Sequence, residues 1–278
     1  MSEQPLVGKI AIVTGASRGV GKGIALSLGE AGATVYVTGR TSREQPGTVP
    51  LTGTVDETAE EINQRGGNGI AVRCDHRNDD DTERLFARIK AEQGQLDLLV
   101  NSAWAGYEGL HDGSDFPLGQ KFWQRRLTYW DDNLFGVRSA YTASVLAARV
   151  MVEQHSGLIV CISGYISSYG SPAYHIAKTA TDRLVAEMAH DLRDEQVAAV
   201  ALYPGLVRTE GILKYAEYID LSNAESPEFS GRAVVALAQD AAILDKTGRS
   251  LWVCDLAKEF GFTDVDGKVL IPTWYPAG

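Results

Sequence analysis

The stretch that decides the fold of this chain runs from Lys9 to Gly23 and reads K-I-A-I-V-T-G-A-S-R-G-V-G-K-G. Its first half is a short apolar run typical of a buried strand. Its second half is a turn that contains Gly15, Gly19 and Gly21, and apolar residues at helical spacing follow the turn. The pattern predicts a strand, a glycine-rich loop and a helix in succession.

A glycine-rich loop between a strand and a helix suits the pyrophosphate of a dinucleotide. Glycines let the backbone turn tightly and approach the phosphates, and the N–H groups and positive dipole end of the helix face the negative charge. The spacing G-x-x-x-G-x-G differs from the G-x-G-x-x-G of the general dinucleotide fingerprint. We expect the residues around the pyrophosphate to be Gly15, Ser17, Arg18, Gly19, Val20 and Gly21.

The end of the next strand indicates which dinucleotide is bound. The strand expected over residues 34–38 ends in Gly39-Arg40-Thr41, where a protein that binds NAD(H) would carry an acidic residue for the ribose hydroxyls. Arg40 suits a 2′-phosphate instead, and Arg18 offers a second cation nearby. The sequence therefore favours NADP(H) over NAD(H), with two solvated arginines as the alternative interpretation.

A tyrosine and a lysine four residues apart, Tyr174 and Lys178, form a candidate pair for proton transfer. This spacing puts both side chains on one face of a helix. A phenol titrates at about pH 10 and a neighbouring cation favours the phenolate, so Lys178 would bring Tyr174 closer to proton transfer at neutral pH. Tyr174 is therefore a candidate general acid/base, although such a pair on a helix is commonly only exposed or packed.

Taken together, these motifs resemble those of the short-chain dehydrogenase/reductase family, and the resemblance covers nearly the whole chain. The family's T-G-x-x-x-G-x-G turn is matched from residue 14, and its P-G-x-V-x-T segment from residue 204. The resemblance implies a catalytic Tyr174 and Lys178, a catalytic Asn133 on a helix, and an adenine-side acid at Asp75. The cofactor-binding residues that it implies outside the glycine loop are Asp75, His76, Asn101, Ala103, Tyr174, Lys178, Pro204, Gly205, Val207 and Thr209.

The chain departs from the family's pattern at two places. The segment that reads N-N-A-G in the family reads N-S-A-W here, and we expect the indole of Trp104 to narrow the pocket. The family's catalytic serine is usually the second residue of a Ser-Ser pair, and that place falls on Gly164 here. We predict that Ser163 is the substitute, with Ser167 and Ser168 as alternatives.

Strand-like and helix-like segments alternate from end to end. Strands are expected at residues 10–14, 34–38, 69–74, 96–101, 157–162, 197–203 and 250–254. Such alternation means a parallel sheet with ligands outside the carboxyl ends of the strands. We predict an α/β protein with a three-layer Rossmann fold, a doubly wound parallel sheet of about seven strands with helices on both faces. The 278 residues lack a Pro/Gly/Ser-rich linker, so residues 1–278 are expected to form one domain.

Four stretches are less regular. Residues 41–56 predict an extended loop beside the adenosine end, either clasping the 2′-phosphate or forming a plain surface insertion, and residues 105–122 lie near the expected substrate entrance. Residues 206–228 match the place of the family's mobile lid over the nicotinamide, and residues 257–278 are expected to wrap another surface. Aromatic residues that hint at an apolar pocket, but would equally suit core or subunit contacts, are Trp104, Tyr107, Trp123, Tyr129, Tyr165 and Tyr169.

Composition argues against several classes of partner. A formal net charge of -10 argues against nucleic acid and acidic membranes, which both need clustered cations. Three cysteines without C-x-x-C spacing favour structural thiols in a reducing compartment. No apolar run approaches 18 residues and no signal peptide is evident, so a cytoplasmic location is predicted. The histidine spacing predicts no metal site.

The predicted reaction is reversible hydride transfer between NADP(H) and a small-molecule carbonyl/alcohol pair. Tyr174 would transfer the proton, Lys178 would lower its pKa and hold the nicotinamide ribose, Ser163 would bind the substrate oxygen, and Asn133 would hold a water in the family's relay. A catalytically silent NADP(H)-binding regulator is the alternative. A sugar-nucleotide epimerase or dehydratase would need a T-G-x-x-G-x-x-G turn and a longer C-terminal domain, which this sequence does not provide.

The two longest helical segments also predict an assembly. Residues 127–154 and 172–193 carry enough Ala, Val and Leu for an apolar face beyond that needed to cover the sheet. Members of the family commonly associate through two such helices. We therefore expect a homodimer or homotetramer.

Overall fold

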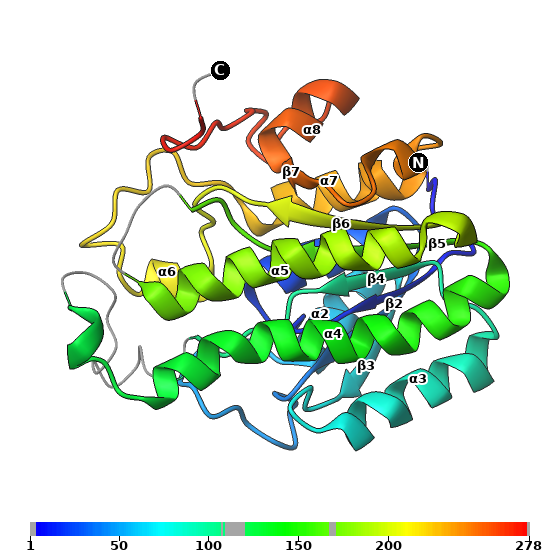
Figure 1. The fold of residues 1–278 in the computed structure, drawn as a ribbon, viewed down its shortest axis with the longest axis horizontal. Helices are drawn as coiled ribbons and strands as arrows, with labels where there is room; N and C mark the ends of the chain where they lie inside the picture. The colour runs from blue at the N-terminus through cyan, green and yellow to red at the C-terminus, as the bar shows by residue number, and fades with distance from the viewer. Residues whose placement is uncertain (1–3, 107, 109–119, 167–170, 277–278) are drawn as a thin grey trace.

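A computed structural model describes residues 4–106, 108, 120–166 and 171–276, and within them seven strands form one sheet (Figure 1). The strand order is β3-β2-β1-β4-β5-β6-β7, and all six pairings are parallel. The predicted doubly wound parallel sheet is confirmed. The strands are β1 (Ile10–Val13), β2 (Thr34–Gly39), β3 (Asn68–Arg73), β4 (Leu98–Asn101), β5 (Gly157–Ile162), β6 (Val197–Tyr203) and β7 (Ser250–Trp252).

Helices cover both faces of this sheet. The near face in Figure 1 carries α3 (Asp79–Gln93), α4 (Thr128–Gln154) and α5 (Pro172–Asp191) side by side. The opposite face packs against α1 (Gly19–Glu30), α2 (Val55–Gln64), α7 (Pro227–Gln239) and α8 (Val253–Phe260). The shorter pieces are α6 (Glu210–Leu213) and three 3₁₀ turns, η1 (Phe122–Gln124), η2 (Arg193–Glu195) and η3 (Ile243–Lys246). None of the helices in the described ranges is long and apolar enough to cross a membrane.

The apolar run that opens the sequence is buried on both faces. In β1, Ala11 and Val13 join the core under α1 and α7, whereas Ile10 and Ile12 join the core under α3, α4 and α5. Successive side chains of a strand point to opposite faces, so a central strand covered by helices on both sides needs apolar residues at every position. This explains why the strand reads as a continuous apolar run and not as an alternating one.

The last strand is shorter than the sequence predicts. Residues 250–254 were expected to form a strand, but β7 ends at Trp252, and Val253 begins α8. The strand β7 lies at the edge of the sheet, and it pairs with the last three residues of β6. Val253 and Cys254 remain buried as helical residues. A short apolar run is compatible with either a strand or a helix, so the pattern alone could not place this boundary.

Helix α1 is fixed in place by a close contact with α7. A Cβ on Gly23 would lie 2.3 Å from the carbonyl carbon of Pro227, so no larger residue fits there without moving one helix. Gly231 of α7 approaches α1 in the same way, with the Gly23 carbonyl oxygen 2.7 Å from the place of its Cβ. The two glycines hold the N-terminal end of α1, and with it the glycine loop, at the carboxyl edge of the sheet.

Candidate active site

The loops that follow the strands converge on one cavity of about 640 Å³ at the carboxyl edge of the sheet. Almost every residue predicted to bind a cofactor or to act in catalysis lines this cavity. Asp75 is the exception, because its carboxylate accepts the backbone N–H of Arg77 at 3.0 Å outside the lining. The predicted residues that line the cavity are Gly15, Ser17, Arg18, Gly19, Val20, Gly21, Arg40, His76, Asn101, Ala103, Asn133, Ser163, Tyr174, Lys178, Pro204, Gly205, Val207 and Thr209.

The loop after β1 and the loop after β4 are locked together. Gly15 has a φ of +66°, and a Cβ at this position would lie 2.7 Å from the Cα of Ala103. The hydroxyl of Thr14 accepts the N–H groups of Ser102 and Ala103 at 3.0 and 3.1 Å. Only glycine tolerates this combination of backbone angle and contact. The Thr-Gly pair therefore sets the floor of the cavity.

The N-terminus of α1 holds an anionic group. The N–H of Gly19, the first residue of the helix, donates to Oε2 of Glu210 at 2.8 Å. Free N–H groups and the positive end of the helix dipole favour a negative charge at this position. A carboxylate is thus bound where a pyrophosphate is expected, which shows that the donors present fit an anionic group.

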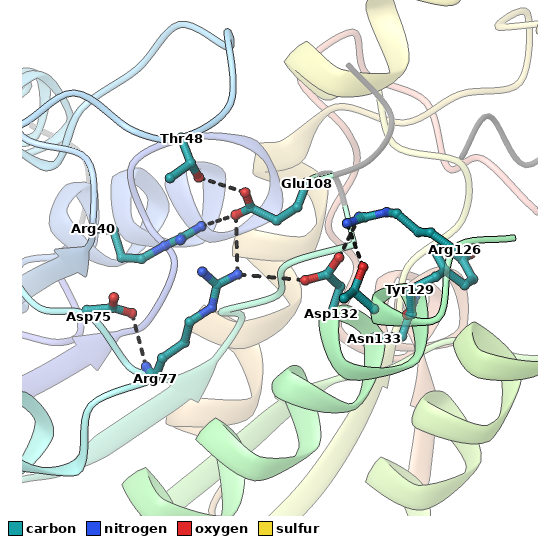
Figure 2. A network of polar contacts seen from close by, with 10 residues as sticks. Arg40, Thr48, Asp75, Arg77, Glu108, Arg126, Tyr129, Asp132 and Asn133 are labelled. Atoms are coloured by element: carbon teal, nitrogen blue, oxygen red, sulfur yellow. Dashed lines mark hydrogen bonds and ion pairs between the residues drawn. The ribbon is translucent and has the colours of Figure 1, made fainter. Parts of the chain in front are cut away.

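The expected adenosine end of the cavity is rich in arginine. Arg18 donates to the carbonyl oxygens of Thr52 and Gly53 at 2.9 and 2.8 Å, so residues 41–56 lie against the glycine loop. Burial is the largest of the causes that lower the pKa of Arg18, and the charge of Arg40 acts in the same direction. Arg40 forms an ion pair with Glu108 (Figure 2).

The loop of residues 41–56 contributes to the site itself. Val49 and Leu51 line the cavity, and the carbonyl oxygen of Pro50 accepts Nζ of Lys214 at 2.6 Å. Of the two alternatives that the sequence left open, a plain surface insertion does not fit these contacts. Lys214 belongs to residues 206–228, so this segment and the loop meet over the cavity, while the predicted lid motion stays a prediction.

His76 has a structural partner in the wall. Its side chain is buried, and Nε2 lies 2.8 Å from the hydroxyl of Thr38 at the end of β2. Burial lowers the pKa of His76 to about 4, so the imidazole is neutral at neutral pH. His76 therefore adds a polar but uncharged group to the wall.

Tyr174 and Lys178 lie together on α5, as their spacing predicts. The ammonium nitrogen of Lys178 is 5.6 Å from the centre of the Tyr174 ring and donates to the carbonyl oxygen of Ile162 at 3.2 Å. Burial lowers the pKa of Lys178 to about 8, although the charge of Asp182 opposes the shift. A pKa of about 8 leaves most of the amine protonated at pH 7. A cation therefore stands beside the phenol.

Two buried amides extend the polar wall. Nδ2 of Asn133 donates to the carbonyl oxygen of Tyr129 at 2.8 Å, and Nδ2 of Asn101 donates to the hydroxyl of Ser144 at 3.0 Å. The Oδ1 atoms of both asparagines have no hydrogen-bond partner among the described residues. Since buried polar atoms are normally paired, these two acceptors mark positions suited to a ligand group or a water.

The Ser163 hydroxyl has a partner on α5. It donates to the carbonyl oxygen of Lys178 at 3.1 Å, and its predicted role at the substrate oxygen, which requires it to face Tyr174, stays a prediction. The next residue, Gly164, is the one beside the phenol, because a Cβ placed on it would lie 3.6 Å from the Tyr174 hydroxyl oxygen. The alternatives Ser167 and Ser168 lie outside the described residues.

Aromatic side chains line the expected substrate end. The ring of Trp104 meets that of Tyr174 edge-on at 5.9 Å between centres, which agrees with a pocket narrowed by the indole. Tyr129 and Tyr165 also line the cavity, whereas Trp123 is 69% exposed and is not part of the wall. The two remaining aromatic residues of the sequence-based hypothesis lie outside the described residues, and they are Tyr107 and Tyr169.

Part of the C-terminal segment reaches the site, which corrects in part the expectation that residues 257–278 wrap another surface. Trp274 lines the same cavity. The segment is held there because Nδ2 of Asn223 donates to the carbonyl oxygen of Ile271 at 2.6 Å, and the buried carboxylate of Asp264 accepts the N–H of Ser226 at 2.8 Å. Irregular chain carries no periodic signal, so the sequence could not reveal this return.

The cysteines and acidic groups of the described residues do not indicate other chemistry. All three cysteines are buried free thiols, and burial raises the pKa of Cys74 and Cys161 to about 12 and that of Cys254 to about 11. They are therefore protonated and unreactive at neutral pH. Across the described ranges, no group of three or more His, Cys, Asp or Glu residues could hold a metal ion.

Comparison with known proteins agrees with this geometry. The family model described as short chain dehydrogenase matches residues 9–217. The chain belongs to the short-chain dehydrogenase family. Mouse Dehydrogenase/reductase SDR family member 1 is 41% identical over 281 residues, which cover 95% of this chain and 85% of the relative. Members of this family are oxidoreductases that bind a nicotinamide cofactor and act on small-molecule substrates.

Solved structures show the same fold. A short chain dehydrogenase from Mycobacterium thermoresistibile has a TM-score of 0.80 at 25% identity, covering 96% of this chain and 92% of that one. A metagenomic short-chain oxidoreductase in complex with NADP has a TM-score of 0.69 at 25% identity, covering 89% and 97%. Both structural similarities extend over most of the chain described above.

The serine position generates the first prediction. If Ser163 turns its hydroxyl toward the substrate oxygen, Ser163→Ala should lower the turnover rate by about 10- to 1,000-fold, as the loss of one transition-state hydrogen bond does. Adding Gly164→Ser should restore much of that rate, because its Cβ would sit in ordinary contact with the Tyr174 hydroxyl. The measurement is kcat of both variants under saturating cofactor. Unchanged turnover in Ser163→Ala would show that the Ser163 hydroxyl takes no part in catalysis.

Proposed function

We propose that this short-chain dehydrogenase interconverts a small-molecule carbonyl and an alcohol with NADP(H), using Tyr174 and Lys178 as the acid-base pair. The observation that carries the proposal is the convergence of this pair and of two anion-binding positions on one cavity. The cavity is lined both by the glycine loop, early in the chain, and by Trp274, late in the chain. This supports residues 1–278 acting as one unit.

Three polar residues of the wall then have defined roles. The bound cofactor would supply or accept the hydride at the substrate carbon. The Tyr174 hydroxyl would donate its proton to the alkoxide oxygen, and the Lys178 ammonium would stabilise the phenolate that remains. Oδ1 of Asn133, which has no hydrogen-bond partner among the described residues, would accept a hydrogen bond from a water that returns the proton. Lys178 would also donate to the nicotinamide ribose.

The preference for NADP(H) is supported by the arginines at the adenosine end. Arg40 lines the cavity at the end of β2, and Arg18 lies in the glycine loop. Guanidinium groups bind phosphate with paired, charge-assisted hydrogen bonds. No acidic residue follows β2 at the position that would bind the ribose hydroxyls of NAD(H), because Arg40 and Thr41 stand there.

We predict that NADPH binds at least about tenfold more tightly than NADH, since one charge-assisted contact contributes about 1.5 to 3 kcal/mol. Arg40→Ala should remove most of this ratio by weakening NADPH binding alone. Arg43→Ala is the matched control, because Arg43 is an exposed arginine of the same loop that pairs with Glu60. Fluorescence titration of both cofactors gives the ratio. Equal affinities in the wild-type protein, or a ratio unaffected by Arg40→Ala, would contradict the preference.

The acid-base assignment predicts a specific loss in Tyr174→Phe. The substitution removes the transferable proton and hardly changes the volume, so turnover should fall by about 100-fold or more while NADPH binding stays intact. NADPH oxidation against panels of aldehydes, ketones, quinones and acyl thioesters first identifies a substrate. Tyr36→Phe, which removes a hydroxyl that donates to Glu92 outside the cavity lining, is the control and should keep full turnover. Near-normal turnover of Tyr174→Phe would rule the mechanism out.

A catalytically silent regulator remains the second candidate only because glycine stands at the family's serine position. Intact NADPH binding without turnover on any of the four substrate panels would favour it. The buried Lys178 beside Tyr174 speaks for catalysis, since a binding protein has no need of a cation next to a phenol.

We also propose that the short-chain dehydrogenase is a homodimer or homotetramer. Helices α4 and α5 lie side by side on one face and expose Tyr141 and Ile176, at 54% and 46% of their surfaces. Apolar side chains exposed on adjacent helices suit an interface between identical copies. Light scattering at micromolar concentration should give a mass of two or four times 30.0 kDa. A species of 30.0 kDa alone would refute the assembly.

A further inference from the structure

Two carboxylates of the chain contact the two groups that are expected to bind phosphate. Glu108 is paired with Arg40, the candidate for the 2′-phosphate, and Glu210 accepts the N–H of Gly19, the candidate for the pyrophosphate. All four residues line the same cavity. Neither carboxylate was singled out by the sequence.

Glu108 is bound from several directions (Figure 2). Oε1 contacts Arg40 and lies 3.4 Å from Nη2 of Arg77, and Oε2 accepts the hydroxyl of Thr48 at 2.7 Å. Only 16% of the side chain is exposed. Burial alone would raise the pKa of Glu108, but the hydrogen bonds from Arg40 and Thr48 and the two guanidinium charges outweigh it and hold the pKa below its usual value. Glu108 is therefore an anion at neutral pH.

The contacts of Glu108 are those that a phosphate would need. Two guanidinium groups and a hydroxyl offer N–H and O–H donors to its two oxygens. A phosphate monoester carries up to about two negative charges and three acceptor oxygens, so it makes stronger use of the same donors than one carboxylate does. A phosphate at Arg40 and the carboxylate of Glu108 would repel each other at contact distance.

Glu210 comes to the helix N-terminus from the loop after β6, which is separated from β1 by β4 and β5 in the sheet. It is the first residue of α6, after β6, and 191 positions separate it from Gly19. Its negative charge also opposes the lowering of the Arg18 pKa, which places it in the field of that guanidinium. The dipole end of α1 and Arg18 thus hold one carboxylate at the position where a pyrophosphate would carry its charge.

We propose that Glu108 and Glu210 are internal competitors for the two phosphate positions, and that Glu108 determines how strongly NADP(H) is preferred over NAD(H). The inference rests on the proposed use of NADP(H). Any dinucleotide would have to displace Glu210, because every such cofactor has a pyrophosphate. Only a 2′-phosphate would have to displace Glu108, so NADP(H) alone bears the cost of breaking the Arg40 pair. A state that must be opened before binding lowers the apparent affinity.

The displacement also connects the two ends of the cavity. The N–H of Glu108 donates to the carbonyl oxygen of Ala105 at 3.0 Å, directly after Trp104, which packs against Tyr174. A nucleotide phosphate that releases Glu108 from Arg40 would therefore act on the turn that carries the wall of the substrate pocket.

The test measures four affinities in two variants. Glu108→Gln should tighten the binding of NADPH and of adenosine 2′,5′-bisphosphate by about 3- to 30-fold, which is at or below the effect of one full charge-assisted contact, and leave NADH and ADP within about twofold. Glu210→Gln should tighten NADPH, NADH and ADP to a similar extent, because these three ligands carry a pyrophosphate, and should affect adenosine 2′,5′-bisphosphate less. Glu44→Gln is the control, because it removes an exposed carboxylate of residues 41–56, close in sequence to Arg40, and should change none of them. Fluorescence titration or calorimetry gives each dissociation constant.

A second readout separates competition from a structural role. Without nucleotide, Glu108→Gln should lower Tm, since Arg40 and Arg77 lose their shared counterion, whereas NADPH should raise Tm by more than it does in the wild-type protein. A lower Tm together with weaker binding of every ligand would make Glu108 a structural residue only. If Glu108→Gln does not fold, Glu108→Asp, which keeps the charge but shortens the reach to Arg40, must still give a smaller, NADPH-selective gain.

Failure of this inference is distinguishable from failure of the proposed function. Selective loss of NADPH binding in Arg40→Ala, with no gain in Glu108→Gln, rejects the competition and keeps the cofactor preference. Weaker NADH binding in Glu108→Gln with unchanged NADPH binding would instead assign Glu108 to the ribose hydroxyls and overturn the inference. In the double variant Arg40→Ala/Glu108→Gln, the gain should vanish, because the competition acts through Arg40.

Discussion

The contact between the glycine loop and the loop after β4 is the constraint on which the rest of the site depends. Gly15 can approach Ala103 only because it lacks a Cβ, and the hydroxyl of Thr14 holds the backbone of that loop by two hydrogen bonds. This contact aligns the N-terminus of α1 with the carboxyl ends of β1 and β4. Anion-binding donors, the wall carried by Trp104 and the phenol of Tyr174 then face the same cavity.

Charge in this cavity is balanced locally, although the chain as a whole has a formal net charge of -10. Arg18, Arg40 and Lys178 bring positive charge to the wall. Glu108 pairs with Arg40, and Glu210 lies at the positive N-terminal end of α1. Electrostatic interactions are stronger where water is excluded, so an uncompensated guanidinium cluster would be costly. Under the competition that we propose, the same balance would make the cavity selective, because a ligand would have to offer more negative charge than the carboxylates it replaces.

Local sequence patterns were enough to predict the family of this chain and many residues of its candidate site. The i and i+4 spacing of Tyr174 and Lys178 needed only a helix to bring them together, and α5 supplies it. The sheet followed from apolar strands alternating with helical segments. Ser163 was harder to judge, because which of two adjacent residues faces Tyr174 depends on how the end of β5 turns away from the sheet.

The sequence by itself determined the strand–loop–helix unit, the parallel sheet, and the residues that follow each strand, because these properties are encoded in spacings of a few residues. Only the tertiary structure decided which distant groups meet. Glu108 lies 68 positions from Arg40, Glu210 lies 191 positions from Gly19, and Trp274 returns to the cavity from the C-terminal segment. An ion pair or a cavity wall of this kind leaves no periodic trace, since it arises from packing between elements and not from the conformation of either one.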